Sequence, residues 1–240
     1  MNADIAQLLE GVANSPFYGF PSAIDSVDKA VSVIGTNQIR NLALPMSVAS
    51  SFAGLPNDLV SMENFWRHSL YCALVACALA KESRGCDPIV VFTAGLLHDI
   101  GKLVLFNRLP EKAKKSLLLV LDQADDLPVY QAKQQIIGFD HALVGGMLAS
   151  HWGLPQLLLE CIACHHAIDK ATRYPRETAL VYLANILAQM AEVNTPNLDD
   201  VSPVDPSAWT ITGLGEDIVE QVVQEARREI SETQKLFFGN

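Results

Sequence analysis

The sequence has little charge and no excess of positive charge. Only 18% of its 240 residues are charged, and 17 Lys and Arg stand against 27 Asp and Glu, which gives a formal net charge of −10. A surface of this sign repels nucleic acid and anionic membranes, so we expect neither as the main partner. A bound metal would still admit an anionic small substrate, because it inverts the local field. Half of the residues are hydrophobic, which excludes a disordered chain.

Long apolar runs and an export signal are also missing. The longest strongly apolar stretch, residues 70–80, is far shorter than the roughly 18–20 residues that span a bilayer, so it is predicted as a buried helix. Residues 1–4 lack the basic region and apolar run of a secretory signal. The five cysteines, an odd number, are therefore expected as reduced thiols. We expect a cytoplasmic protein that does not enter a membrane.

No run of residues has the alternating pattern of a strand, and the dominant period is helical. There are no internal repeats and no glycine-rich phosphate loops. Apolar spacing, capping residues and prolines predict helices over residues 5–14, 26–34, from 36 onward with a break or kink at Pro45, 61–83, 88–100, 111–126, 128–137, 140–152, 155–167, 175–193 and 216–237. Residues 194–209, with three prolines, are predicted as a linker. The fold class is therefore predicted as all-α, a multi-helix bundle.

Candidate chemistry is concentrated in a histidine–aspartate pair on an apolar segment. A helix buried through residues 94–102 would bring His98 and Asp99 into the core. A buried carboxylate is costly without a partner, and a cation would satisfy it. Imidazole and carboxylate together suit iron, manganese or zinc, and an aspartate has two oxygens with which to bridge two ions. The alternative is a metal-free hydrogen-bonded His–Asp pair.

Lys102 follows Asp99 by one turn and lies on the same helix face. A lysine in this position can meet a phosphate group as a point charge. A competing motif is Cys161-x-x-Cys164-His165, the pattern of covalent haem attachment or of a redox dithiol. The absence of an export signal and of a βαβ context disfavours both, and we expect two small buried thiols instead.

Several motifs in order resemble the HDOD family, the HD-related output domains of bacterial signalling proteins. The resemblance covers most of residues 1 to about 190. It is carried by residues 13–19, 30–35, 40–42, 65–69, 95–102, 138–141, 152–155 and 165–166. It implies an HD-like helical core at residues 56–195, preceded by a shortened N-terminal helical lobe at 1–55 and followed by a linker and C-terminal helix at 196–240.

HDOD domains are similar to HD-type metal-dependent phosphohydrolases and to HD-GYP phosphodiesterases, and the resemblance implies roles for individual residues. The first metal would be held by His68, His98 and Asp99, with Asp99 bridging to the second. The ligands of the second metal would be His141, His165 and His166. Lys102 would face a phosphate, and a metal-bound water would be the nucleophile.

Two departures from the enzymes bear on activity. HD enzymes usually complete the first metal site with an aspartate where this chain has Asn185, whose neutral oxygen binds a hard cation more weakly and cannot act as a base. The HD-GYP loop is represented by residues 173–175, in which an arginine replaces the glycine. The resemblance therefore favours a regulatory domain that keeps one or two divalent ions (Fe, Mn or Zn), acts through signalling protein partners and turns over little. The alternative is a metal-dependent phosphohydrolase acting on a nucleotide or cyclic nucleotide, with Asp99 and Lys102 as catalytic residues.

The remaining motifs are given structural interpretations. His151 is expected at a surface or interface, because it is about 80° from His141 around a helix. The aromatic residues Phe65, Trp66 and Trp152 are expected to pack in the core or between subdomains and not to form a base-stacking platform. Residues 225–232 are expected to form a solvated helix face. The apolar residues 236–238 could dock either on the body or on a partner.

Overall fold

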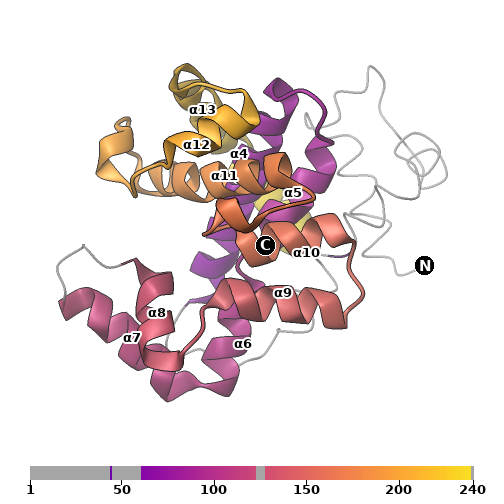
Figure 1. Cartoon of the computed structure of the whole chain (residues 1–240). Helices are drawn as coiled ribbons and strands as arrows, with labels where there is room; N and C mark the ends of the chain where they lie inside the picture. The colour runs from indigo at the N-terminus through magenta and orange to yellow at the C-terminus, as the bar shows by residue number, and fades with distance from the viewer. Residues whose placement is uncertain (1–43, 45–60, 123–127, 239–240) are drawn as a thin grey trace.

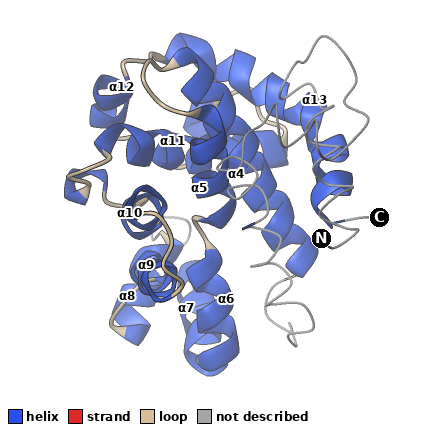
Figure 2. Cartoon of the chain, turned by 90° about the vertical axis from the view of Figure 1, so that its right-hand side faces the viewer, coloured by secondary structure: helices blue, strands red, loops and turns tan. Residues whose placement is uncertain are grey.

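The computed structural model describes residue 44 and residues 61–122 and 128–238, and within these ranges it contains helices and no strands (Figure 2). The α-helices are α4 (Met62–Glu82), α5 (Pro88–Leu97), α6 (Ile100–Arg108), α7 (Pro110–Asp122), α8 (Val129–Ile137), α9 (His141–His151), α10 (Gln156–Cys164), α11 (Pro175–Val193), α12 (Pro206–Thr212) and α13 (Val219–Phe238). Three short 3-10 helices, Ile168–Lys170, Leu198–Asp200 and Glu216–Ile218, lie between them. The predicted all-α class is confirmed. The helices predicted before residue 44 and the lobe at 1–55 lie outside the described residues, Leu44 excepted.

Helix α4 forms the centre of the core. Ser61 caps its N-terminus by accepting a hydrogen bond from the Asn64 amide (3.4 Å), and the residues from Cys72 to Ala80 are all buried. A helix that is apolar all round belongs inside a protein. It packs against α5, α11 and α13, which surround it in the upper part of Figure 1. The aromatic residues Phe65 and Trp66 are buried here, as the sequence predicts.

A second layer lies below this core and holds α6, α7, α8 and α9 (Figure 1). Helix α6 packs against α9, and α7 packs against α8. Helix α10 joins the two parts, because it contacts α9 below and α5 and α11 above. The side chain of Trp152, at the end of α9, packs against buried apolar residues of this region, as expected.

The predicted helix over 88–100 is interrupted at the candidate site. The structure ends α5 at Leu97 and begins α6 at Ile100, with His98 and Asp99 in the turn between them. Asp99 has φ −98° and ψ 4°, a bridge conformation that recurs at functional positions. The pair is therefore not inside a continuous helix, as the apolar pattern predicts, but at a break between two helices.

Residues 88–108 together are long and apolar enough to cross a membrane, which makes them a longer apolar segment than residues 70–80. In the most apolar stretch of 18 residues within this segment, 83% is buried inside the molecule. It is also divided by the break after Leu97. A core segment has these properties as well, so the described residues supply only weak evidence for a membrane span.

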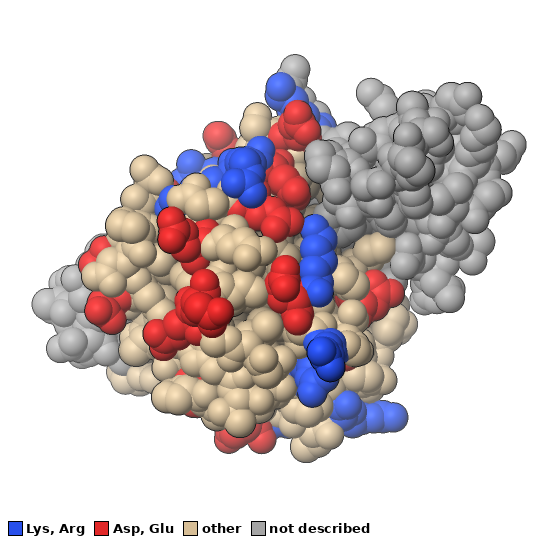
Figure 3. Space-filling view, turned by 90° about the horizontal axis from the view of Figure 1, so that it is seen from above, with Lys and Arg blue, Asp and Glu red and all other residues tan. Residues whose placement is uncertain are grey.

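The C-terminal part differs from its prediction in two places. The expected linker at 194–209 already contains the start of α12, which packs against α11. The expected solvated face at 225–232 contributes contacts: Arg227 donates to the carbonyls of Met190 (2.7 Å) and Thr195 (3.3 Å), which satisfies the C-terminal end of α11. Phe237 packs on the body against Phe92, with ring centroids 5.7 Å apart. The face seen from above carries acidic and basic side chains side by side (Figure 3).

Candidate metal centre

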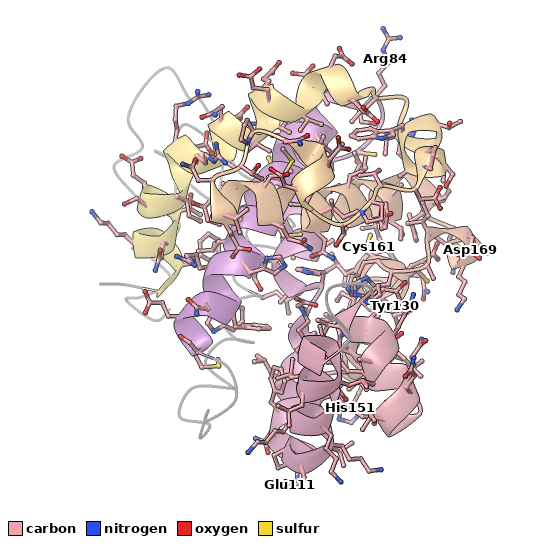
Figure 4. All side chains as sticks on the ribbon, turned by 90° about the vertical axis from the view of Figure 1, so that its left-hand side faces the viewer. Arg84, Glu111, Tyr130, His151, Cys161 and Asp169 are labelled. Atoms are coloured by element: carbon pink, nitrogen blue, oxygen red, sulfur yellow. The ribbon has the colours of Figure 1, made fainter. Side chains whose placement is uncertain are left out.

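Six predicted ligands form two neighbouring groups of three, and the ligand atoms within each group lie within 4.8 Å of one another. The first group is His68 from α4 with His98 and Asp99 from the α5–α6 turn, and the second is His141 from the start of α9 with His165 and His166 from the turn after α10. Residues that are up to 98 positions apart in sequence (166 − 68 = 98) are thus brought together. Tyr130, labelled in Figure 4, contacts the second group through the His166 ring. His151 is exposed, as expected.

Asp99 lies between the two groups and turns one oxygen toward each. Its Oδ2 is 3.3 Å from His98 Nε2 and 3.9 Å from His68 Nε2. Its Oδ1 is 2.9 Å from His141 Nε2 and 3.8 Å from His165 Nε2. This is the arrangement of a carboxylate that is able to bridge two cations.

Two glycines bring the helices close enough for this arrangement. A Cβ on Gly95 would lie 3.0 Å from Cα of Ala73 in α4, so the bare glycine lets α5 approach α4. A Cβ on Gly101 would lie 2.0 Å from the carbonyl oxygen of His141, so only glycine lets α6 approach the first turn of α9. The two glycines on either side of the His–Asp pair therefore allow the close contacts of α5 with α4 and of α6 with α9.

The first group is oriented by partners outside it. His98 Nδ1 is 2.7 Å from the Gly95 carbonyl oxygen, and His68 Nδ1 is 2.9 Å from Glu192 Oε2. Asn185 Oδ1 lies 3.0 Å from His68 Nε2, so Asn185 does border this group as the resemblance implies. Glu192 follows Asn185 by seven residues on α11 and faces the same side.

The second group has a comparable set of contacts. His165 Nδ1 is 2.8 Å from the Ile162 carbonyl oxygen. His166 Nε2 is 3.0 Å from His141 Nε2, and the His166 ring stacks on Tyr130 of α8 with centroids 4.3 Å apart and 13° between the planes. Asp140 caps α9 by accepting from the Leu143 amide (2.9 Å), which places His141 at the first helical position.

The donor set fits a divalent cation, and two buried atoms carry this conclusion. The Nε2 atoms of His98 and His165 are buried and have no hydrogen-bond partner among the described residues. In both rings Nδ1 faces a carbonyl oxygen, so Nδ1 must donate and Nε2 is left with a lone pair when the ring is neutral. Both lone pairs point toward the Asp99 carboxylate. A cation between them would satisfy all three groups.

Burial and neighbouring charge shift the pKa values of the centre. Burial alone would raise the pKa of Asp99, but His98, Lys102 and His141 hold it well below its usual range. Burial lowers the pKa of His165 to about 3, with His98 adding to the effect. Burial also lowers the pKa values of His141 and His166 well below the usual range. These histidines are therefore neutral at pH 7, as metal ligands must be.

Two lysines border the centre, and sequence reasoning found only one of them. Lys102 forms an ion pair with Asp99 Oδ2, and a quarter of its side chain is exposed. Lys133 of α8 is fully buried, and its Nζ is 3.4 Å from His141 Nδ1. Burial lowers the pKa of Lys133 to about 7, and Lys102 adds to the effect.

Sequence reasoning missed Lys133, Glu192, Tyr130 and Glu160. A signal for Lys133 exists, because it lies four residues after Val129 and four before Ile137, on the apolar face of its helix. Glu160 accepts hydrogen bonds from the backbone amides of Arg173 and Tyr174, both 2.9 Å, and so holds the loop at 173–175. No local pattern distinguishes Glu160 or Tyr130 from ordinary helix residues.

Of the cysteine motif, Cys161 is part of the core, and Cys164 is less buried than expected. Cys161 is buried, Cys164 is half-buried, and both are free thiols. Burial raises the pKa of each thiol, which disfavours the reactive thiolate. This agrees with the interpretation of Cys161 and Cys164 as packing residues.

The family of the chain follows from a comparison with known proteins. The profile of the HDOD domain family matches residues 5–168, more than half of the chain. The chain belongs to the HDOD domain family. The predicted resemblance is thus confirmed at the level of the family and of the fold.

Curated relatives of this HDOD chain are distant and longer. An uncharacterized protein of Treponema pallidum (strain Nichols) is 23% identical over 188 residues, which cover 77% of this chain and 36% of that protein. Ribonuclease Y of Chloroflexus aurantiacus is 26% identical over 157 residues, which cover 61% of this chain and 25% of that enzyme. The HDOD chain thus spans about a third and a quarter of these relatives.

Solved structures share the HDOD fold. An HDOD domain protein of Geobacter sulfurreducens superposes with a TM-score of 0.73 at 22% identity, covering 99% of this chain and 83% of that one. A candidate phosphohydrolase of Shewanella amazonensis gives 0.71 at 20% identity, covering 98% and 82%. A candidate signal transduction protein of Marinobacter aquaeolei gives 0.71 at 19% identity, covering 96% and 51%. At these identities the likeness establishes the fold and not the activity.

Proposed function

We propose that this HDOD chain is a regulatory domain of bacterial signal transduction that holds a divalent metal ion, acts through protein partners and turns over little or no substrate. Iron, manganese and zinc suit the ligand set of imidazoles and one carboxylate. Membership of the HDOD family supports the regulatory role, as does the structural likeness to a candidate signal transduction protein.

The observation that carries the metal is the pair of buried Nε2 atoms on His98 and His165. Each has a lone pair directed at Asp99 and no hydrogen-bond partner among the described residues. A metal-free His–Asp pair, the alternative raised by the sequence, would place a proton between imidazole and carboxylate. The carbonyl oxygens of Gly95 and Ile162 keep the ring protons on Nδ1, at the far side of each ring.

Two features support low turnover. Asn185 stands at the edge of the first group, 3.0 Å from His68 Nε2, where its neutral oxygen can ligate but cannot take a proton. Lys102 already forms an ion pair with Asp99, so its positive charge is partly neutralised within the protein and is less available to a phosphate ligand.

The metal proposal is tested by the metal content of the full chain. The protein is purified without chelators and without a histidine tag, incubated with Fe²⁺, Mn²⁺ or Zn²⁺ in turn, and analysed by elemental mass spectrometry. We expect one to two ions per chain, and their loss in Asp99→Asn, which keeps the shape of the side chain but removes its charge. An absence of bound metal after incubation with all three ions would overturn the metal centre.

Turnover is tested separately. A panel of mononucleotides, dinucleotides and cyclic dinucleotides is incubated with the metal-loaded chain, and we expect no metal-dependent hydrolysis above the Asp99→Asn background. Binding of a partner should instead respond to surface substitutions that leave the metal content unchanged. Hydrolysis that Asp99→Asn abolishes would refute the regulatory proposal.

Lys102 favours a second candidate function, a metal-dependent phosphohydrolase. Lys102 forms an ion pair with Asp99, whose side chain is only 2% exposed, while a quarter of the Lys102 side chain is exposed. Its ammonium group therefore lies where a phosphoester would approach from solvent. When bound, a divalent ion would lower the pKa of a coordinated water toward neutrality and so supply a nucleophile. The likeness to ribonuclease Y and to a candidate phosphohydrolase points the same way. Under this alternative Lys102→Met abolishes hydrolysis and retains the metal.

A further inference from the structure

The outward side of helix α7 is basic and partly apolar. Ala113 and Ser116 are buried against the molecule, whereas Lys115 and Leu118 lie on the opposite side of the helix, where Leu118 is 49% exposed. Within residues 108–115 four cations and one carboxylate are exposed, namely Arg108, Lys112, Lys114, Lys115 and Glu111. The four cations and Leu118 together are called the basic face below.

The basic face is not neutralised by the chain around it. The lysines that form ion pairs with carboxylates in the described part of the chain are Lys81 and Lys102, and neither belongs to this face. In a chain of net charge −10, such a surface is available to a partner of opposite charge. The exposed side chain of Leu118 favours a protein partner, which can bury it, over the phosphate backbone of a nucleic acid.

The chain itself carries a surface of the complementary composition. Residues 177–226 contain nine Asp and Glu and no Lys, Arg or His. Six of these carboxylates are exposed and form no ion pair in the part of the chain that the structure describes: Asp199, Asp200, Asp205, Glu216, Asp217 and Glu220. Val193, at the end of α11, adds an apolar side chain that is 67% exposed. The six carboxylates and Val193 together are called the acidic face below.

The basic residue that borders the acidic face is already engaged. Arg176 of α11 donates to the backbone carbonyl oxygens of Arg84 at 2.6 Å and Ile211 at 3.3 Å. Its guanidinium group thus joins α12 to the end of α4 and forms no ion pair with a carboxylate of the acidic face. The acidic face therefore keeps its charge for a partner.

The two faces lie at opposite ends of the molecule. Helix α7 is at the bottom and α12 at the top in both ribbon views (Figures 1 and 2). The faces of one chain therefore cannot meet each other, but the basic face of one copy can meet the acidic face of another. Each such contact leaves one free face of either sign, which is the property of a heterologous interface that grows into a ring or a filament.

We propose that the chain associates with itself head to tail, with the basic face of one copy on the acidic face of the next. Opposite charges bring the copies together and fix their orientation, and Leu118 and Val193 supply apolar surface to bury. The inference does not depend on the metal centre, and it adds a second copy of the chain as a partner.

The first test is sedimentation velocity of the full chain over a wide range of protein concentration. At ~0.05 M NaCl wild type should grow beyond dimers as its concentration rises, and at ~0.5 M NaCl the association should weaken because salt screens exposed charges. Lys112→Glu with Lys115→Glu reverses charge on the basic face, and Glu216→Lys with Glu220→Lys reverses it on the acidic face. Each double variant alone should associate at least ~10-fold more weakly than wild type.

Mixing the two double variants shows whether they are still folded. The first keeps an intact acidic face and the second an intact basic face, so a 1:1 mixture should form pairs through one native contact and stop at pairs. Lys170→Glu with Lys235→Glu is the matched control, because it changes the net charge equally at exposed lysines outside both faces. It should associate as wild type does.

Three results would overturn the inference. The first is a wild-type chain that stays monomeric at low salt at every concentration. The second is association that is lost when the basic face is reversed and kept when the acidic face is reversed, which indicates a symmetric dimer through α7. The third is a monomeric wild type that binds a fluorescent oligonucleotide through the basic face, which would assign this surface to nucleic acid. None of the three would affect the metal centre.

Discussion

His98 Nε2 and Asp99 Oδ2 lie 3.3 Å apart, and neither atom brings a proton to the contact. Nδ1 of His98 donates to the Gly95 carbonyl oxygen, and Asp99 Oδ2 accepts from the Lys102 ammonium group. His98 Nε2 therefore has no hydrogen-bond partner among the described residues, and a buried polar atom without a partner is destabilising. A divalent cation at this position could supply the missing partner.

Metal should stabilise the folded chain for this reason. A ligand that binds only the native state adds RT ln(1 + [L]/Kd), about 2.7 kcal/mol at 100-fold excess over Kd. Addition of Mn²⁺ to chelator-treated protein should raise the midpoint of thermal unfolding, and removal of the ion should reverse the change. Asp99→Asn is the control, because it should unfold at the same temperature with and without the ion. An equal response of both chains would show that the ion binds elsewhere.

Glu192→Gln tests the orientation of His68. Both ring nitrogens of His68 face acceptors, Nδ1 the Glu192 carboxylate at 2.9 Å and Nε2 the Asn185 amide oxygen at 3.0 Å. A neutral ring donates to only one of them, and the charged Glu192 favours Nδ1, which would leave Nε2 free to bind a cation. We expect metal affinity to fall by roughly 10–100-fold, as for other carboxylates behind metal-bound histidines. Competition with a chelator of known affinity measures the change. Glu220→Gln, at an exposed residue of α13, controls for the loss of one charge, and an equal effect there would contradict the role of Glu192.

The candidate metal ligands were accessible to sequence analysis because they lie in motifs with distinctive residue types. His98 and Asp99 interrupt an apolar run, and His165 and His166 are adjacent. The helix break after Leu97 could not be predicted, because neither His98 nor Asp99 is a glycine or proline and apolar residues stand on both sides of them. At the break Asp99 faces His141, a contact between residues 42 positions apart (141 − 99 = 42) that local periodicity does not contain.

Residues that contact the candidate ligands were harder to predict, because these contacts also join residues far apart in sequence. Lys133 and Glu192 are charged residues on amphipathic helices, where the usual expectation is a solvated side chain. Their contacts with His141 and His68 depend on how α8 packs near α9 and α11 near α4, and periodicity carries no information about such packing. The prolines at 203 and 206 suggested a linker, but Pro206 is a first-turn proline that begins α12.

Gly101→Ala should disrupt the approach of α6 to α9. The added Cβ would meet the His141 carbonyl oxygen at 2.0 Å and the Gly145 amide nitrogen at 2.6 Å, and both are backbone atoms that cannot rotate away. We expect a loss of stability at or above the upper end of the roughly 1–3 kcal/mol that overpacking costs. Gly146→Ala, where the added group meets the side chain of Ala163 at 2.7 Å, should cost less. Urea unfolding of both variants measures the difference, and a harmless Gly101→Ala would contradict the close contact.

Acid should destabilise the metal-free chain well before the carboxylates titrate. Burial lowers the pKa of His165 from 6.5 to about 3, so between these values the unfolded chain binds a proton that the folded chain excludes. The stability that neutral His165 contributes is therefore fully present above pH 6.5 and decreases as the pH falls toward 3, by up to ~1.4 kcal/mol per pH unit. Urea unfolding in chelator at about pH 7, 6 and 5 should show this slope reduced in His165→Asn, whose amide can keep the bond to the Ile162 carbonyl oxygen. His151→Asn, at an exposed histidine of α9, controls for the substitution itself. An unchanged slope in His165→Asn would mean that the buried ring takes up its proton without loss of the fold.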